Sequence, residues 1–433
     1  MAGPSPAPRG TPGARGAGAT AANAAPRTMA ATMPTPPPSP AARLRAVKRH
    51  VWLGRHRFLA TCAVGLEELV AEEVARLPGV DRPERRTGGV AFDAPFDTVY
   101  PALLRLRVAE SLRVYLAHDE AAVTFPMLHD HLTRVRWPLW LPAACAVTVR
   151  VKSTKSRLRD EAGLERTLRR TLHGQGIDAE AAGAPPLTLH LHLHHDRASV
   201  TLDAGGPLHR RRGDKWVAPT TIRETTAAAL VHWAGLAAAD HDLIVDPFCG
   251  SGTVVIEALE AAAGAAAGRH RPVPLQVCPV WKPERSAHAR RTHGGAGALE
   301  GAPPMWASDA DPDAVRAANH NLAAYGYAER VRAEIVRAQA LDLLALARRH
   351  GARRPLLVTN PPYGKGAAAR GTSPRALLND LLGRAEGWAF ALLYPRPSDL
   401  DDLAGVEVRQ VRTLVTGGLK NAVIVGRVGA RGD

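Results

Sequence analysis

Apolar residues recur at two spacings between residues 51 and 206, and they predict short strands and helices there. Those of "GLEELVAEEVARL" share one face of a helix: Leu66, Leu69, Val70, Val74 and Leu77. Apolar and polar residues alternate in "LTLHLHLHHDRASVTLDAGG", which indicates two half-buried strands with outward-facing histidines. We therefore predict two small α+β units, at 51–115 and 116–206.

A strand–helix alternation begins near Asp242. "LIVDPFCGSGTVVIEALEAAA" has the pattern of strand, glycine loop and helix, and "PMWASDADPDAVRAANHNLAAYG" that of strand, acidic turn and helix. Apolar runs follow in "RPLLVTNPPYG", "WAFALLYP" and "NAVIVGRV". This alternation is typical of a doubly wound, mostly parallel sheet. Residues 207–433 are thus predicted to form an α/β domain with an insertion at 264–304, which would offer basic surface to a partner.

Composition narrows the class of protein. The 433-residue chain is 45% hydrophobic, as globular proteins are, and no uncharged apolar stretch is long enough for a membrane span. A net charge of +15 and a pI of about 10.4 favour nucleic acid as partner over a merely basic surface. The four cysteines lack CxxC spacing, which argues against a zinc site or a disulfide framework and fits a reducing, cytoplasmic setting.

Residues 1–50 differ from the rest. The first 45 are mostly Ala, Pro, Gly, Arg and Thr, and no Asp or Glu occurs before Glu67. Such a segment cannot bury enough apolar surface to fold, so we expect a disordered basic tail. The alternatives are a start at Met29 or Met33 instead of Met1, and an organelle transit peptide.

The loop "DPFCGSGT" (246–253) follows the first strand of the α/β domain, where ligands of open parallel sheets bind. Gly250 and Gly252 allow a ligand close to the backbone, and the next helix offers free N–H groups to an anionic group. The loop lacks the lysine of a P-loop, and Val255 breaks the nicotinamide pattern. Asp309, after the second strand, is expected to hold the two hydroxyls of a ribose; helix capping is the alternative.

The stretch "TNPPYG" (359–364) ends a buried strand with two prolines, which cannot donate to a sheet ladder. The corner presents one amide side chain and one aromatic ring. Taken alone, it is typical of an ordinary strand-ending turn.

Together these motifs resemble class I S-adenosylmethionine-dependent methyltransferases that modify the amino groups of bases: "DPFCGSGT" resembles their first motif, "ASDADP" the second and "NPPYG" the fourth. From about residue 57 the chain is similar to THUMP-domain guanine-N2 RNA methyltransferases, above all those of large-subunit (23S) ribosomal RNA. Further resembling pieces are "GLEELVAEEV", "VKSTKSRL" and "GGPLHRRRGDKWVAPTTIRETTAAAL". The resemblance implies a ferredoxin-like domain at 51–115, a THUMP-like RNA-binding domain at 116–206 and guanine-N2 methylation.

The resemblance also assigns catalytic roles. The side-chain oxygen of Asn360 and the carbonyl of Pro361 would accept the two hydrogens of the base's amino group, and Pro362 would keep the corner rigid. Tyr363 would stack on a base taken out of its helix. "KGAAARGT" (365–372) would close over that base.

S-adenosylmethionine is the implied cofactor. Its expected contacts are Asp246, Phe248, Gly250, Gly252, Thr253, Asp309 and Asp342, and, toward the methionine end, Arg223, Glu224 and Thr225. Asp342 is chosen for the adenine, since Gln339 stands near the position where the family often has an acid. Capping of a helix start is the alternative for residues 223–225.

RNA contacts are expected from the two densest basic stretches: Lys152, Lys155 and Arg157, and Arg210, Arg211, Arg212 and Lys215. Solvated surface is the alternative for both. The histidines at 190, 192 and 194 alternate with leucines, so we interpret them as a polar strand face and expect no metal site.

Other acceptors present a similar planar NH2 group: a guanine of transfer RNA, adenine N6 or a protein glutamine. A non-catalytic RNA-binding factor of the same fold is a further alternative, which cofactor binding would distinguish. We expect a monomer.

Overall fold

The alternation of leucine and histidine builds one strand of a large sheet, because neighbouring side chains of a strand point to opposite faces. In the computed structural model, β6 (Leu187–His194) buries its four leucines and turns its histidines outward, as predicted. The structure describes residues 39–182, 186–217, 221–236, 241–295, 299, 302–363, 373–401 and 405–429. From Ala41 onward the described residues form one compact unit.

The first sheet has seven strands in the order β2-β3-β1-β4-β7-β6-β5. Their bounds are β1 (Arg55–Thr61), β2 (Asp81–Arg86), β3 (Gly89–Pro95), β4 (Ser111–Ala121), β5 (Val147–Thr154), β6 and β7 (Arg197–Asp203). Neighbours are antiparallel except β5 and β6. Strand β4 pairs with β1 on one side and β7 on the other, so the two predicted α+β units share one sheet. The domain boundary near residue 115 falls inside β4 and stays a prediction.

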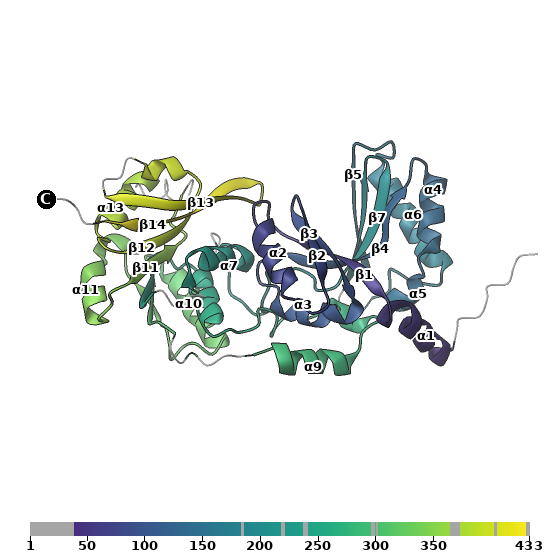
Figure 1. The fold of residues 1–433 in the computed structure, drawn as a ribbon, viewed down its shortest axis with the longest axis horizontal. Helices are drawn as coiled ribbons and strands as arrows, with labels where there is room; N and C mark the ends of the chain where they lie inside the picture. The colour runs from purple at the N-terminus through teal and green to yellow at the C-terminus, as the bar shows by residue number, and fades with distance from the viewer. Residues whose placement is uncertain are drawn as a thin grey trace, which may run out of the picture. The chain divides into compact units, whose positions relative to one another are not determined.

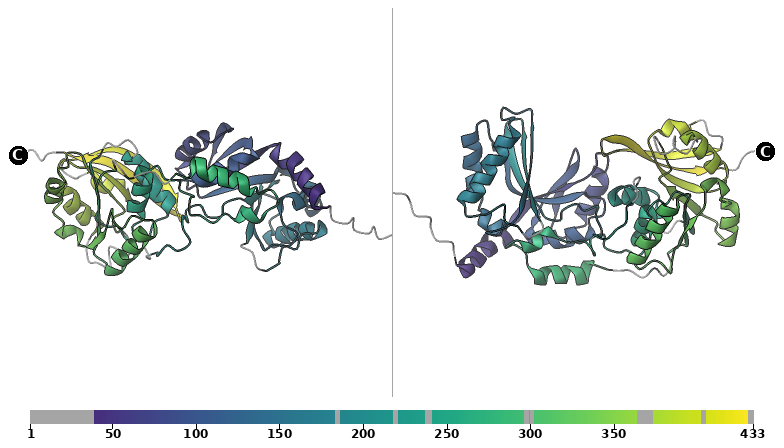
Figure 2. Two further views of the ribbon diagram at one scale, coloured as in Figure 1. Left: turned by 90° about the horizontal axis from the view of Figure 1, so that it is seen from below. Right: turned by 180° about the vertical axis from the view of Figure 1, so that it is seen from behind.

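Helices pack against the first sheet, and those over β4 and β5 are visible in Figures 1 and 2. The elements are α2 (Glu67–Ala75), η2 (Phe96–Thr98), α3 (Val99–Arg105), α4 (Phe125–Arg134), α5 (Trp137–Trp140) and α6 (Glu161–Gly174). Helix α6 begins at Glu161, because the Asp160 side chain accepts a hydrogen bond from Gly163 N (2.9 Å) and caps it.

The predicted tail is shorter than expected. Helix α1 (Pro40–Val47) and the single turn η1 (Lys48–Trp52) are folded, and Val47 and Val51 are buried. Arg43 donates to the carbonyls of Pro138 and Leu141 (2.8 Å each). Two apolar side chains and one arginine thus fasten residues 40–50, which composition alone assigned to the tail. Residues 1–38 lie outside the described residues.

The second sheet has the order β10-β9-β8-β11-β12-β14-β13, and only the pairings of β14 are antiparallel. Its strands are β8 (Leu243–Asp246), β9 (Met305–Asp309), β10 (Ala333–Ile335), β11 (Pro355–Thr359), β12 (Ala389–Tyr394), β13 (Val406–Thr416) and β14 (Leu419–Val428). Gly417 and Gly418, both at positive φ, join β13 and β14 in a two-residue turn. The predicted doubly wound α/β fold is confirmed.

Two apolar layers cover the second sheet. Successive residues of β8 show this, because Ile244 belongs to the apolar cluster that includes residues of α7, α8 and α10, while Leu243 and Val245 belong to the one that includes residues of α11 and α13. Helices α7 and α11 are labelled beside this sheet in Figure 1. The helical elements are α7 (Glu224–Trp233), α8 (Thr253–Ala262), α10 (Pro312–Ala324), η5 (Ala338–Ala340), α11 (Leu343–Arg349), α13 (Pro374–Gly383) and η6 (Pro397–Leu400). Burial on both faces explains why the strands are continuous apolar runs.

The insertion at 264–304 packs on the first half of the chain. It contains η4 (Pro274–Val277) and α9 (Pro283–His293), and α9 contacts α3. Arg271, buried, donates to the carbonyls of Leu103 (2.8 Å) and Leu208 (2.7 Å). The expectation that the insertion offers basic surface to a partner is therefore wrong for Arg271.

Candidate functional site

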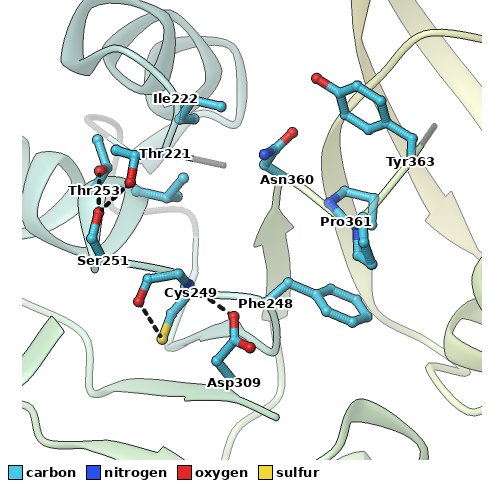
Figure 3. A pocket seen from close by; sticks show the side chains of 13 residues that line it. Thr221, Ile222, Phe248, Cys249, Ser251, Thr253, Asp309, Asn360, Pro361 and Tyr363 are labelled. Atoms are coloured by element: carbon cyan, nitrogen blue, oxygen red, sulfur yellow. Dashed lines mark hydrogen bonds between the residues drawn. The ribbon is translucent and has the colours of Figure 1, made fainter. Parts of the chain in front are cut away.

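A pocket of about 230 Å³ lies at the carboxyl ends of β8, β9 and β11 (Figure 3). Its walls come from the β8–α8 loop, the segment before α7, the end of β9 and the corner after β11. The lining residues are Thr221, Ile222, Phe248, Cys249, Gly250, Ser251, Thr253, Val254, Asp309, Asn360, Pro361, Pro362 and Tyr363. This is the edge of the sheet at which ligands of this fold class bind.

The glycine loop has a shape that other residues adopt with difficulty. Gly250 and Gly252 have φ of 53° and 79°, and Gly252 is the N-cap of α8. A Cβ at Gly250 would meet no atom within 4 Å, so that backbone is open to a ligand. A Cβ at Gly252 would lie 3.4 Å from Ala318, so this glycine serves helix packing and does not line the pocket.

Asp309 connects the loop to the second strand. Its Oδ2 accepts a hydrogen bond from Gly250 N (3.1 Å) and its Oδ1 accepts one from Asp311 N (3.0 Å). The carboxylate lines the pocket although the residue is buried. Since each carboxylate oxygen has a second lone pair, Asp309 is positioned to accept two hydroxyl hydrogen bonds.

Asp246 lies behind the pocket wall, outside its lining. Its Oδ1 accepts hydrogen bonds from Thr359 Oγ1 (2.5 Å) and Phe248 N (3.2 Å), which fastens the end of β8 to the end of β11. Its Oδ2 is buried and has no hydrogen-bond partner within the described chain. Burial raises the pKa of Asp246 to about 7, and the charge of Asp309 adds to the shift.

The raised pKa of Asp246 gives a pH prediction. The folded state holds a proton that the unfolded state has lost, so the free energy of unfolding falls as pH rises from about 4 to about 7, by at most about 1.4 kcal/mol per pH unit. Asp246→Asn should lack this component. Urea unfolding of both proteins at pH 5 and pH 8 measures it, and parallel pH profiles would contradict the prediction.

The corner after β11 brings its side chains to the pocket. Asn360 projects toward the space between Ile222 and Tyr363 (Figure 3), and its Oδ1 is buried with no partner among the described residues. The Tyr363 ring meets Tyr394 edge-on (centroids 6.3 Å apart), and Tyr394 is fixed by its hydrogen bond to Asp399 (2.8 Å). An amide oxygen without a partner beside a supported aromatic ring suits a planar ligand that carries an NH2 group.

More than half of the fourteen predicted catalytic and cofactor-binding residues meet here. Eight of them line the pocket: Phe248, Gly250, Thr253, Asp309, Asn360, Pro361, Pro362 and Tyr363. Sequence reasoning singled out none of the other five, Thr221, Ile222, Cys249, Ser251 and Val254. Cys249 and Ser251 stand inside the quoted glycine loop, and Thr221 and Ile222 stand inside the quoted stretch that ends in "TTIRETTAAAL". Membership of these stretches was the signal that could have identified all four.

Residues 223–225 do not line the pocket. Arg223 pairs with Glu110 (2.6 Å), and Glu224 accepts a hydrogen bond from Lys215 Nζ (2.7 Å). Thr225 is buried, and its Oγ1 has no hydrogen-bond partner in the described part of the chain. Arg223 is the N-cap residue of α7 but its side chain makes no capping hydrogen bond, so these residues start the helix without the expected cap. Thr221 and Ile222 occupy the pocket wall instead.

Asp342 also lies outside the lining. Its Oδ1 accepts a hydrogen bond from Ala345 N (2.8 Å), which caps α11. Gln339 belongs to η5 and is likewise outside. The geometry gives no support to an adenine contact from Asp342. The predicted closing loop, 365–372, lies outside the described residues.

The predicted RNA contacts divide by exposure. Lys152, Lys155, Arg157 and Arg210 are exposed, and Arg212 is held by Asp214 (2.9 Å for both hydrogen bonds). Arg211 and Lys215 require correction. Arg211 is 3% exposed and bonds to Glu257, and the Lys215 ammonium is held between Glu224 and Thr253 (2.9 Å to its Oγ1). Neither cation is available to a phosphate.

Across the described ranges, no group of three or more His, Cys, Asp or Glu side chains could hold a metal ion. Likewise, no described helix has the length and apolarity needed to cross a bilayer.

Two family models match the chain. Residues 211–392 match the one described as RMKL-like, methyltransferase domain, and residues 57–114 match the RlmL ferredoxin-like domain.

Curated relatives carry the name ribosomal RNA large subunit methyltransferase K/L. That of Syntrophotalea carbinolica is 30% identical over 84% of this chain and 52% of its own length. That of Methylococcus capsulatus is 28% identical over 84% and 50%. The chain spans about half the length of these relatives.

Solved structures share the fold over nearly their whole length. A predicted N6-adenine-specific DNA methylase from Listeria monocytogenes aligns with a TM-score of 0.71 and 24% identity, covering 87% of this chain and 97% of its own. SMU.472, a putative methyltransferase complexed with SAH, aligns with a TM-score of 0.72 and 24% identity, covering 88% and 99%. At this identity the similarity shows the class I methyltransferase fold.

Proposed function

Because residues 211–392 match the RMKL-like methyltransferase domain family and residues 57–114 match the RlmL ferredoxin-like domain family, we propose that this chain methylates the N2 amino group of a guanine in large-subunit ribosomal RNA. S-adenosylmethionine is the methyl donor in this proposal. A monomer acting in the cytoplasm is part of the same proposal. The observation that carries it is the buried Oδ1 of Asn360, which has no hydrogen-bond partner among the residues that the structure describes and stands at the wall of a pocket that a glycine loop also lines.

The pocket fits S-adenosylmethionine by its donor set. Asp309 offers carboxylate oxygens to two ribose hydroxyls, and the open backbone at Gly250 allows close approach. The end of α8 that begins at Thr253 has the positive end of the helix dipole, which favours the cofactor's carboxylate. The cofactor supplies an activated methyl group on its sulfonium.

Asn360 acts on the acceptor. The lone pair of a purine amino nitrogen is delocalised into the ring, so this nitrogen is a weak nucleophile. Hydrogen bonds from the amino group to Asn360 Oδ1 and to the carbonyl of Pro361 would turn the lone pair toward the methyl group. Both prolines restrict the backbone, so the acceptors are in place before the base arrives.

Tyr363 holds the base. Its ring is half-buried, and burial raises the pKa of its hydroxyl, so the side chain is neutral at physiological pH. Tyr394 supports the ring from behind, leaving a face for stacking. A neutral amide and a neutral phenol leave no strong base at this wall, so the amino proton would pass to water after transfer.

RNA as the acceptor is supported by charge outside the pocket. Lys152, Lys155 and Arg210 are exposed, and the formal net charge is +15. Contacts with phosphates would supply affinity without sequence information.

Methyl transfer tests the proposal directly. The protein is incubated with tritiated S-adenosylmethionine and unmodified total RNA, and the digested nucleosides are separated. Label in N2-methylguanosine from large-subunit RNA is expected, and label in transfer RNA would change the substrate. Label in N6-methyladenosine would replace the base. Cofactor binding without label would move the search to DNA or protein glutamine, and absence of cofactor binding would favour a non-catalytic RNA-binding factor.

A second prediction concerns Asp309. Asp309→Ala removes acceptors for the ribose and for Gly250 N, so affinity for S-adenosylhomocysteine should fall about 10- to 100-fold. Isothermal calorimetry measures this. Asp313→Ala is the matched control, because Asp313 follows the same motif directly and its side chain is 74% exposed. Equal affinities of the two variants would contradict the role of Asp309.

A further inference from the structure

A cationic surface lies outside the pocket, where η1 meets the insertion. Trp52 Nε1 donates to the carbonyl of Val280 (2.9 Å), across 228 residues of sequence. Lys282 Nζ lies 3.4 Å from the centroid of the Trp52 ring, in a cation–π contact. These contacts bring η1, whose first three residues were predicted to belong to the tail, beside the predicted insertion.

The η1–α9 patch, as we call this surface, comprises Lys48, Arg49, His50, Arg136, Lys282 and Arg285. All are exposed except Lys282, which is half-buried. Arg136 Nη1 lies 2.6 Å from His50 Nε2 and so joins α5's start to η1.

Few acids neutralise the patch. Arg285 lies 3.5 Å from Asp97, and Glu284 is the acid of α9's first turn. Among the described residues, Lys48, Arg49 and Arg136 have no acidic partner within 4 Å.

The cations of the patch repel one another. Burial lowers the pKa of Lys282, the charges of Arg285 and Lys48 lower it further, and Asp97 and Glu284 oppose them. Desolvation and the charges of Arg136 and Arg49 lower the pKa of His50. Mutual repulsion of these cations raises the free energy of the folded protein, and a bound polyanion would offset that repulsion.

The patch is also held rigidly. Val47 and Val51 anchor η1 in the core, and Tyr100 accepts a hydrogen bond from Lys282 N (2.9 Å) while its ring lies 4.8 Å from that of Trp281. Because these contacts already fix the backbone, less conformational entropy is lost when a ligand binds.

We propose that the η1–α9 patch binds the phosphate backbone of the substrate RNA at a distance from the target base. The inference rests on the proposed function, because it takes the same RNA as its ligand. In the proposed function only the target base and the cofactor enter the pocket, whereas an RNA presents many phosphates. Contacts outside the pocket would fix its register without reading its sequence.

The test compares two triple variants of the full chain. One is Lys48→Ala/Arg49→Ala/Arg285→Ala. The control, Arg332→Ala/Arg348→Ala/Arg349→Ala, removes three exposed cations elsewhere and gives the same net charge. Binding of an unmodified large-subunit ribosomal RNA transcript is measured between about 50 and 200 mM salt.

In the patch variant, the plot of log affinity against log salt concentration should be less steep than in the wild type, by about two to three in slope. Three phosphate contacts are removed, and each contributes about 0.7 to 0.9 to the slope. The control should match the wild type. S-adenosylhomocysteine affinity, unchanged in both, would show that the variants are folded. If the wild type binds RNA and both variants have equal slopes, the proposed role of the patch is wrong, while the proposed function still stands. A wild type that binds cofactor but no RNA would overturn the RNA acceptor, and the patch with it.

Discussion

Asn360→Ala should lower kcat for methyl transfer by about 100- to 1,000-fold, comparable to the loss of one preorganised hydrogen-bonding group in other active sites. The variant loses the buried Oδ1 that we assign to the amino group of the base. Affinity for S-adenosylhomocysteine should change by less than about threefold, since Asp309 and the glycine loop remain. Single-turnover transfer and calorimetry separate the two effects.

Two further variants sharpen this test. Asn360→Asp keeps an acceptor oxygen in place, so it should retain more activity than Asn360→Ala. Asn379→Ala is the matched control, because Asn379 is exposed on α13 outside the pocket. A wild-type rate in Asn360→Ala, with the cofactor bound, would remove Asn360 from the mechanism.

Glu257→Gln should lower the free energy of unfolding by about 3 to 5 kcal/mol, the usual cost of breaking a buried ion pair on one side. Glu257 is 1% exposed on α8, and its carboxylate pairs with Arg107 (2.7 Å) and Arg211 (3.0 Å). Although burial opposes ionisation, the charges of these arginines hold the pKa of Glu257 below its usual value. Without the carboxylate, two guanidinium groups remain in a dry site.

Urea unfolding measures this loss. Glu72→Gln is the control, because Glu72 forms an exposed pair with Arg76 four residues along α2 (3.5 Å) and should contribute less than about 1 kcal/mol. A loss below about 1 kcal/mol in Glu257→Gln would mean that water reaches the cluster.

The α/β domain was largely predictable because its signals are local. A glycine loop between a strand and a helix, and an Asn-Pro-Pro corner after an apolar run, each specify backbone shape within about ten residues. Parallel strands then bring their carboxyl ends to one edge. Asp309 and Asn360 therefore reach the same pocket although 51 positions separate them in the sequence.

Long-range pairing was not predictable. Three consecutive arginines, 210–212, are alike in sequence, but only Arg211 meets Glu257, 46 residues further on. Helix α4 and strand β13 were not identified, although Thr124 caps α4 and Pro126 follows at its start. The joining of two units through β4 depends on partners at both strand edges, which no local pattern encodes.

Strand β4 has a consequence for how this chain can be divided. A gene fragment that stops at residue 115 would cut β4 inside its pairing with β7, which begins at Arg113 opposite Asp203. Each half would then display unpaired backbone along an apolar sheet, which invites aggregation. Recombination or gene fusion would therefore have to keep residues 41–206 together.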